Sequence, residues 1–398
     1  MWFFIEFLSA DVARLTTMSE AFVSQHSARV NSKLQFCDGT VTPMSIANPA
    51  RGQKPRATMK QVAALAGVGT KTVSRVVNDE PNVAPGTAQR VWDAVRALDY
   101  HVDLQAGSLR RTDGRTRTLG LLISSVDNPF AGAIHRAVED AATERGVAVF
   151  ASSLDDDADR EERAVTAFLQ RRVDGLILTT AGRRQNYVAH LQDRGIPVVY
   201  VDREPRGTEA DSVTSDNRAA ARAGTEWLIS HGHRRIALLA DRREIPTAAE
   251  REGGFLDATR EAGIPTAQTP VIAGLRDADA AHRALKALLE SDQPPTAVFS
   301  AQNLITIGAI HALREAGAEH SVALVGFDDV PLADLLDPGI TVIAQDPQEI
   351  GRIAVARIFE RLEGDTSPAL HHVVPTSFVP RGSGEIPPPS QLPATASA

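Results

Sequence analysis

The sequence of 398 residues is poor in cysteine, in aromatic residues and in long apolar stretches. Its one cysteine, Cys37, excludes an intrachain disulfide and is typical of a reducing compartment. The apolar run Trp2–Ile5 is too short to span a bilayer and is broken by Glu6, so we predict neither a signal peptide nor a membrane anchor and expect a cytoplasmic protein. Gly-rich phosphate loops and a Gly-x-Ser-x-Gly nucleophile motif are lacking, which disfavours an enzyme.

The net charge of −8 is unevenly distributed along the chain. Residues 54–117 contain eleven Lys and Arg and six Asp and Glu, a net charge of +5, which leaves −13 for the remainder. A basic segment joined to an acidic body is typical of a DNA-binding domain attached to a separate sensor.

The two ends of the chain carry no periodic pattern. Residues 1–55 show no sustained hydrophobic period, so we expect a disordered extension. A gene start at Met44 or Met59 would also give a complete patterned protein. Residues 382–398 are rich in Pro, Ser and Ala, and we expect them to form a disordered tail.

A first short helix is predicted to begin after Thr58. Thr58 and Gln61 have the spacing of a capping box, in which each residue satisfies a backbone N–H of the other. Gly67 then ends the apolar pattern, since glycine readily adopts the left-handed conformation that terminates helices.

A second helix is predicted over residues 70–77 and a third over about 86–98. In the second helix Val73, Val76 and Val77 share one face, which leaves the polar residues on the opposite side. Two short helices joined by a tight turn predict a helix-turn-helix, whose second helix reads the major groove of DNA. The alternative is a helical bundle whose polar face is merely solvated.

The sequence MKQVAALAGVGTKTVSRVVN (Met59–Asn78) closely resembles the DNA-binding start of the LacI/GalR family of transcriptional regulators. The similarity continues through PNVAPGTAQRVWDAVRALDY and into HVDLQAGSLRR (His101–Arg111), the segment that forms the hinge helix in that family. The resemblance implies a helix-turn-helix domain over residues 56–102, followed by a hinge helix and linker over 103–116.

The same resemblance implies which residues contact double-stranded DNA. Thr70, Lys71 and Arg75 match base-reading positions, and Leu109 matches the residue that opens a base step in the minor groove. The complete set implied is Thr70, Lys71, Thr72, Ser74, Arg75, Asn78, Ala106, Leu109 and Arg110.

The chain departs from the family pattern at three places. Gly69 and Ala84 stand where the family usually has Ser, so a helix cap is lost at each position. Val102 and Asp103 replace the usual Pro-Asn; Asp103 can still cap a short hinge helix, but it places a negative charge near DNA.

From Leu119 onward, short apolar segments alternate with predicted helices. Such a pattern predicts parallel sheets covered on both faces, which bind ligands beyond the carboxyl ends of their strands. The predicted strands are Leu119–Ile123, Val147–Ala151, Gly175–Thr179, Val198–Asp202, Ile236–Ala240, Ala297–Ser300 and Val322–Phe327. The polar residues at strand ends are Asp127-Asn128, Asp202-Arg203, Gln302-Asn303 and Asp328-Asp329.

The resemblance to the LacI/GalR family extends over this region, in segments such as DNPF, RRVDGLIL, GIPVVYVDR, PPTAVFSAQN and VALVGFDDVPLADLLDP. It implies an α/β domain of the two-lobed periplasmic-binding-protein type over residues 117–381, with three chain crossings between the lobes. Lobe one is expected from residues 117–213 and 346–374, and lobe two from 214–345 and 375–381.

Carried over by position, the cleft that binds the effector is expected to contain Phe130, Asp202, Arg251, Arg276 and Asn303. The family usually has aromatic residues at Arg276 and Ala131 and Asp at Asn303, so this cleft is expected to be less aromatic and more positive. We therefore expect a polar, anionic effector such as a sugar acid or a phosphorylated sugar. For Arg276 a plain surface position is a nearly equal alternative.

We expect no cofactor and no metal site. His231 and His233 lie in a predicted loop, and His371 and His372 are adjacent, but neither pair has a Cys or carboxylate at metal-ligand spacing. Residues 155–159 are acidic without the Gly turn and distal Glu of a calcium loop, and are better explained as a solvated helix start.

The resemblance implies a transcriptional regulator, and in most relatives a repressor, that binds a pseudo-palindromic operator as a homodimer and responds to a small polar metabolite. A periplasmic solute-binding protein would share the α/β body but lack the helix-turn-helix. A sugar-processing enzyme would need a catalytic constellation that the sequence does not show. The sequence does not identify the effector or the operator. It also leaves open whether the effector weakens or strengthens operator binding, and whether the protein is a dimer or a tetramer.

Overall fold

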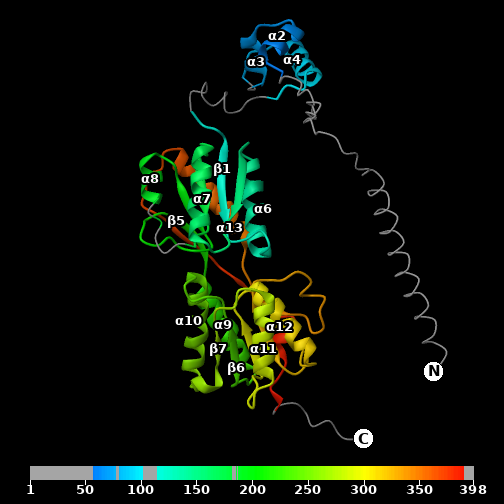
Figure 1. The fold of residues 1–398 in the computed structure, drawn as a ribbon, viewed down its shortest axis with the longest axis vertical. Coiled ribbons are helices and arrows are strands. Elements are labelled where there is room, and N and C mark those ends of the chain that lie inside the picture. The colour runs from blue at the N-terminus through cyan, green and yellow to red at the C-terminus, as the bar shows by residue number, and fades with distance from the viewer. Residues whose placement is uncertain (1–56, 78–79, 102–113, 182–184, 186, 390–398) are drawn as a thin grey trace, which may run out of the picture. The chain divides into compact units, whose positions relative to one another are not determined.

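The computed structural model describes residues 57–77, 80–101, 114–181, 185 and 187–389. The chain divides near residue 102 into two compact units, which are described separately. Figure 1 shows the helices of the first unit in blue and the α/β body of the second in cyan to red.

In the described residues of the first unit, three helices surround a small core. They are α2 (Met59–Ala66), α3 (Thr70–Val77) and α4 (Pro85–Ala97). The predicted capping box is confirmed: the side chain of Thr58 accepts from the N–H of Gln61, and the Gln61 side chain accepts from the N–H of Thr58. Gly67 ends α2 with a φ of 65°, a left-handed conformation that a residue with a Cβ rarely adopts.

The three helices are held together by their apolar stripes. Val62 of α2, Val73 of α3 and Val91 of α4 are fully buried against one another. Since these valines come from three helices that are individually too short to be stable, tertiary packing supports the unit.

The second unit contains two parallel-dominated sheets, each of six strands, in agreement with the predicted two-lobed α/β fold. The lobe-one sheet has the order β11-β5-β4-β3-β1-β2. Its strands are β1 (Thr118–Ile123), β2 (Ala148–Ser153), β3 (Gly175–Leu178), β4 (Val198–Val201), β5 (Asp211–Ser215) and β11 (His371–Val374).

The lobe-two sheet has the order β12-β10-β9-β8-β6-β7, and all its pairs are parallel except β10 with β12. Its strands are β6 (Ile236–Leu239), β7 (Val271–Ile272), β8 (Ala297–Ser300), β9 (Ala323–Phe327), β10 (Thr341–Ala344) and β12 (Ser377–Val379).

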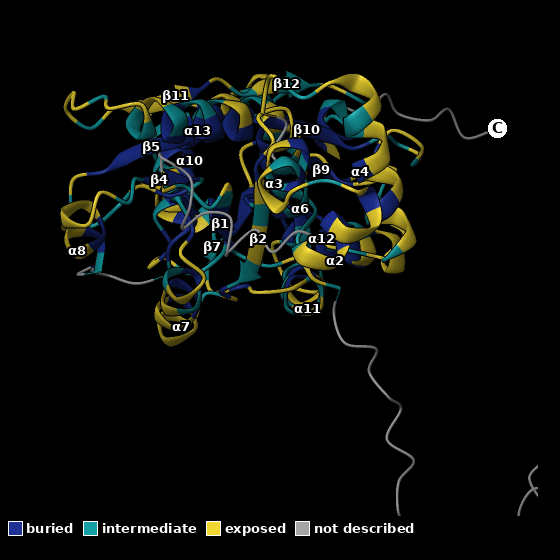
Figure 2. Ribbon diagram, turned by 90° about the horizontal axis from the view of Figure 1, so that it is seen from above, coloured by how far each residue is buried: buried dark blue, intermediate teal, exposed yellow. Residues whose placement is uncertain are grey.

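Helices cover both faces of each sheet, and the central strands between them are buried (Figure 2). In lobe one, α6 (Pro129–Thr143) and α13 (Pro347–Leu362) pack on one face, and α7 (Ala158–Gln170) and α8 (Tyr187–Asp193) on the other. In lobe two, α9 (Asn217–Ser230) and α10 (Pro246–Glu261) share one core, and α11 (Ala278–Leu289) and α12 (Asn303–Glu315) the other.

The chain passes between the lobes three times, after β5, after β10 and after β11. These crossings place the carboxyl ends of the central strands of both sheets along the boundary between the lobes. Ligand-binding residues of parallel sheets are expected at these ends.

Two strand predictions need correction. The segment at β2 was predicted as a buried strand, but β2 is the edge of its sheet and the Phe150 side chain is exposed. In the described chain the structure also adds β5, β7, β10, β11 and β12, which are short or lack an uninterrupted apolar run.

The predicted tail is also ordered in part: residues 382–389 pack on lobe two. The Ser383 side chain is buried and donates to the carbonyl of Leu324, and the Trp227 indole donates to the carbonyl of Gly384. His233, expected in a surface loop, is buried, and its Nε2 lies 2.8 Å from the carbonyl oxygen of Ile386. These contacts oppose the disorder that the composition favours.

Candidate DNA-reading face and effector cleft

Helix α3 presents a polar face because its apolar residues are buried in the core. Val73 and Val76 are buried, whereas Thr70, Lys71 and Arg75 are exposed. Thr72 and Ser74 are half-buried at the margin of this face. The remaining predicted DNA contacts, Asn78, Ala106, Leu109 and Arg110, lie outside the described residues.

The Arg75 side chain is exposed and can reach a partner outside the protein. Its Nε lies 3.8 Å from Glu80 Oε2, and both side chains are about half exposed. Such a surface ion pair is weak, so a guanine edge or a phosphate competes well for the guanidinium. The expected loss of a cap at Ala84 is confirmed, since α4 begins with no side-chain cap and with Pro85 in its first turn.

The lobe-one side of the boundary carries Asp202 and Arg203 directly after β4. Arg203 is buried, and its Nη1 donates to the carbonyl of Thr180 at 2.8 Å. Asp202 has a φ of 68°, and its N–H donates to the carbonyl of Val213 at 3.0 Å. Burial raises the pKa of Asp202, while the nearby Arg203 and Arg251 act in the opposite direction.

The lobe-two side is built around Arg251 of α10. Its Nε donates to Asn217 Oδ1 at 2.8 Å and its Nη1 to the carbonyl of Ala301 at 2.9 Å. The guanidinium stacks 3.7 Å above the Phe327 ring and lies 3.9 Å from the Asp328 carboxylate. Burial lowers the pKa of Arg251, and the carboxylates of Asp328 and Asp202 oppose that change.

Two sets of side chains connect the lobes across this boundary. Asn128 and Asn303 form a reciprocal amide pair, with N···O distances of 3.2 and 2.9 Å. Asp156 of lobe one pairs with Arg242 of lobe two at 2.8 Å. The boundary is thus lined by polar side chains that exchange hydrogen bonds and ion pairs, and a pocket bordered by Asp202, Asn217 and Glu250 opens at it. We call this polar boundary the interlobe cleft; its groups suit a small molecule rich in donors and acceptors.

The five residues predicted for the cleft are not equally placed. Asn303 is buried at the start of α12, and Phe130 is half-buried in the first turn of α6, where its N–H donates to Asn128 Oδ1. Arg276 is exposed, and among the described residues it takes no part in the Asn128–Asn303 and Asp156–Arg242 contacts that join the lobes. The positive charge expected from Arg276 is therefore held instead by Arg203 and Arg242.

Sequence reasoning missed several residues of the cleft. Arg203, Asn128 and Asp328 were noted as strand-end residues but were not assigned to the site. Asp156 was interpreted as part of a solvated helix start, and Arg242 was not assigned a role, although they follow β2 and β6 and the same strand-end rule would have found them.

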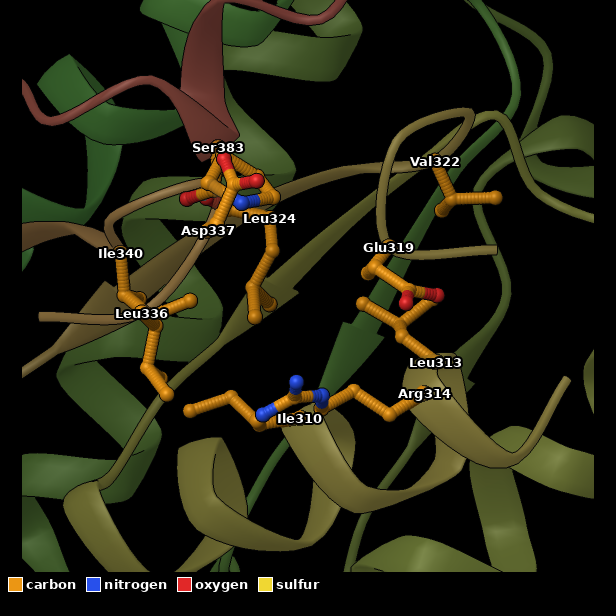
Figure 3. Close-up of a pocket in the computed structure, with 11 residues that line it drawn as sticks. Ile310, Leu313, Arg314, Glu319, Val322, Leu324, Leu336, Asp337, Ile340 and Ser383 are labelled. Carbon is orange, nitrogen blue, oxygen red and sulfur yellow. The ribbon is translucent and has the colours of Figure 1, made fainter. Parts of the chain in front are cut away.

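A separate small hollow, with a cavity volume of about 20 Å³, lies in lobe two between the end of α12 and the connection from β9 to β10 (Figure 3). Leu324, Leu336 and Ile340 face it, with Ile310 and Arg314 of α12 on the opposite side. Its lining is mostly aliphatic, so it lacks the dense polar groups of the cleft and fits a polar effector poorly.

The two units match two parts of one known family. Residues 58–103 match the family described as "Bacterial regulatory proteins, lacI family", and residues 116–377 match "Periplasmic binding proteins and sugar binding domain of LacI family". The chain belongs to the LacI family. It is a transcriptional regulator and not an enzyme, as its sequence predicts.

This LacI-family regulator is similar to curated relatives over most of their length. It is 33% identical to the HTH-type transcriptional regulator PtxS of Pseudomonas aeruginosa, over 84% of this chain and 97% of that protein. It is 32% identical to the HTH-type transcriptional repressor PurR of Erwinia tasmaniensis, over 77% of this chain and 90% of that protein.

Solved structures agree with the fold. A Lac repressor dimer bound to operator and the anti-inducer ONPF matches with a TM-score of 0.73 and 26% identity, over 83% of this chain and 99% of that one. The regulator CelR in complex with cellobiose matches with a TM-score of 0.59 and 31% identity, over 82% and 100%. In the described part of this regulator, no helix has the length and apolarity needed to cross a membrane.

Proposed function

We propose that this regulator binds a pseudo-palindromic operator as a homodimer, acts as a repressor in the cytoplasm, and is controlled by a sugar or sugar derivative in the interlobe cleft. The observation that carries the proposal is the polar cleft itself, in which Asp202 and Arg203 of one lobe meet Arg251 and Asp328 of the other. A ligand that binds both walls acts on the relative position of the lobes.

A sugar suits the chemistry of these walls. Carboxylates of the cleft can accept hydrogen bonds from hydroxyl groups and its arginines can donate to them, and the half-buried Phe130, which packs on the lobe-one core, adds an apolar side chain. The relatives support the same class, since one solved neighbour is a complex with cellobiose and another, the Cra regulator of Pseudomonas putida at 27% identity, is a complex with fructose 1-phosphate.

The coupling to DNA follows from the interlobe contacts. An effector that changes the Asn128–Asn303 and Asp156–Arg242 contacts shifts the lobes, and lobe one is joined by residues 102–113 to the DNA-reading unit. The coupling is reciprocal, so an effector that weakens operator binding binds less tightly to the operator complex.

The test begins with selection of a DNA sequence from a random pool by the full-length protein. Sugars are then screened by thermal shift, and those that bind are added to operator titrations. We expect one class of sugar to change operator affinity by at least about fivefold. Arg75→Ala serves as the control, since it alters DNA binding and leaves the cleft intact. Sugars that bind without any effect on operator affinity would contradict the proposal.

A further inference from the structure

Asp156 bridges two arginines that belong to different lobes. Its Oδ1 accepts from Arg203 Nη1 at 2.7 Å, and its Oδ2 lies 2.8 Å from Arg242 Nη2. Each carboxylate oxygen thus has its own guanidinium. The Asp156 side chain thus occupies the position at which an arginine of each lobe meets the other.

The turn that presents Asp156 has an unfavourable backbone. Asp155 and Asp156 have φ values of 50° and 55°, so two consecutive residues with a Cβ are in the left-handed region. The turn is held by two hydrogen bonds, from the N–H of Asp155 to the carbonyl of Ser124 and from the N–H of Asp157 to the carbonyl of Leu154. Left-handed backbone at two consecutive residues with a Cβ is strained, so displacement of the Asp156 side chain would allow the turn to release that strain.

The two arginines form a site for an oxyanion, which we call the two-arginine site (Arg203 and Arg242). Guanidinium groups bind carboxylates and phosphates through paired N–H donors. In the described part of the chain, the Nε atoms of both arginines are buried and lack a hydrogen-bond partner. Their nearest other carboxylates, Asp202 and Asp241, lie 3.6 and 3.9 Å from these Nε atoms, beyond hydrogen-bond distance.

We propose that Asp156 occupies the two-arginine site in the absence of effector, and that a carboxylate or phosphate group of the effector replaces it. The exchange substitutes one anion for another, so both guanidinium groups, that of the buried Arg203 and that of the half-buried Arg242, remain paired. The inference rests on the proposed function and makes it more specific, because it names the effector as a sugar acid or a sugar phosphate.

The test uses the full-length chain and inorganic phosphate as probe, measured by isothermal titration calorimetry. Asp156→Asn keeps the shape of the side chain and removes its charge, so we expect phosphate to bind about tenfold or more tightly than to wild type. Asp155→Asn is the matched control: Asp155 lies in the same turn but pairs with Arg160 and not with the two-arginine site. Phosphate binding by the DNA-reading unit contributes equally to all of these proteins.

A second variant tests the site without relying on the turn. Arg242→Gln in the Asp156→Asn background is expected to remove the gain in phosphate affinity, because one of the two guanidinium groups is lost. Equal phosphate affinity of wild type and Asp156→Asn, or an equal gain in Asp155→Asn, would overturn the proposal.

Titrations with three sugars distinguish the anion classes: D-gluconate carries a carboxylate, D-glucose 6-phosphate carries a phosphate, and D-glucose is the neutral reference. We expect one of the two anions to bind more tightly than D-glucose, by a margin that Asp156→Asn increases. If Asp156→Asn gains anion binding but no sugar alters operator affinity, the two-arginine site stands and the proposed regulation fails. If neutral sugars alone alter operator affinity and the variant gains nothing, the regulation stands and this inference fails.

Discussion

Asp202 of lobe one and Asp328 of lobe two occupy equivalent positions of the two sheets and have the same φ of 68°. Asp202 follows β4 and Asp328 follows β9, and each of these strands is third from the β11 or β12 edge of its sheet. The N–H of Asp202 donates to the carbonyl of Val213 on β5, and the N–H of Asp328 donates to the carbonyl of Ile343 on β10. The two lobes therefore present a carboxylate to the cleft through the same backbone geometry. Arg251 interacts electrostatically with both.

Because Arg251 serves both carboxylates, we expect Arg251→Ala to abolish the response to effector and to lower the free energy of unfolding by about 3 kcal/mol. The stability loss follows from the Asp328 carboxylate losing its arginine, from the Asn217 Oδ1 losing its donor and from the lost stacking on Phe327. Operator binding of the folded variant should persist. Urea denaturation and operator titrations with and without effector measure the two effects, and Arg251→Lys, which keeps the charge without the fork, should lose part of each. A full effector response in Arg251→Ala would exclude Arg251 from the site.

Arg276→Ala should leave effector affinity within about twofold of wild type, because an exposed arginine adds little to a ligand enclosed by other side chains. Calorimetric titration of the effector gives the answer. A loss of tenfold or more would restore Arg276 to the cleft, as the resemblance implies.

Arg75→Ala is expected to cost about 1–3 kcal/mol of operator affinity and to relax specificity at one base pair, because the exposed guanidinium of α3 can read a guanine edge. Titrations against single-base variants of the operator measure this. Arg96→Ala removes the same charge from α4, where Arg96 is exposed beside Asp93, and should weaken binding without changing specificity. The same loss on random DNA for Arg75→Ala would mean that Arg75 contacts only phosphate.

Gly308→Ala should destabilise lobe two by about 3 kcal/mol, because its Cβ would lie 2.2 Å from the carbonyl oxygen of Ala278 on the neighbouring helix. Gly132→Ala in α6 is the control, since no atom lies within 4 Å of its Cβ, and we expect it to stabilise by about 0.5–1 kcal/mol. Thermal and urea unfolding compare the two variants. Equal stability of both would show that α11 and α12 separate at little cost.

Asp211 should account for part of the loss of stability in acid. Burial raises its pKa, but hydrogen bonds from Arg361, from the N–H of Leu370 and from Arg357 outweigh this, so the pKa lies below its usual value. A carboxyl with a lowered pKa stabilises the folded state above the unfolded pKa of about 3.9, and that stabilisation is lost as the pH falls through the lower folded pKa.

We therefore expect Asp211→Asn to lower the free energy of unfolding by about 3 kcal/mol at pH 7. The difference from wild type should shrink below about pH 4, since the wild-type carboxyl is then increasingly protonated. Urea unfolding at a series of pH values measures this. A difference that is the same at pH 7 and at pH 3 would show that the charge of Asp211 is not responsible.

The sequence by itself determined the reading unit, because its signals are local. The cap of Thr58 on Gln61, the left-handed Gly67 and the apolar stripe of α3 all depend on residues within about one helical turn of each other. The positions of the long apolar strands were predictable for the same reason, since an uninterrupted apolar run identifies a strand that is covered on both faces.

Only the tertiary structure decided what the strand ends bring together. Asp156, Arg203 and Arg242 come from three separate segments, and their meeting depends on the order of the strands and on three chain crossings, which local pattern does not encode. The two-residue β7 is too short to show a period. The segment around Ser383 has the composition of a disordered tail, yet it is ordered because the carbonyl of Leu324 accepts its hydroxyl in a buried site that exists only after lobe two has folded.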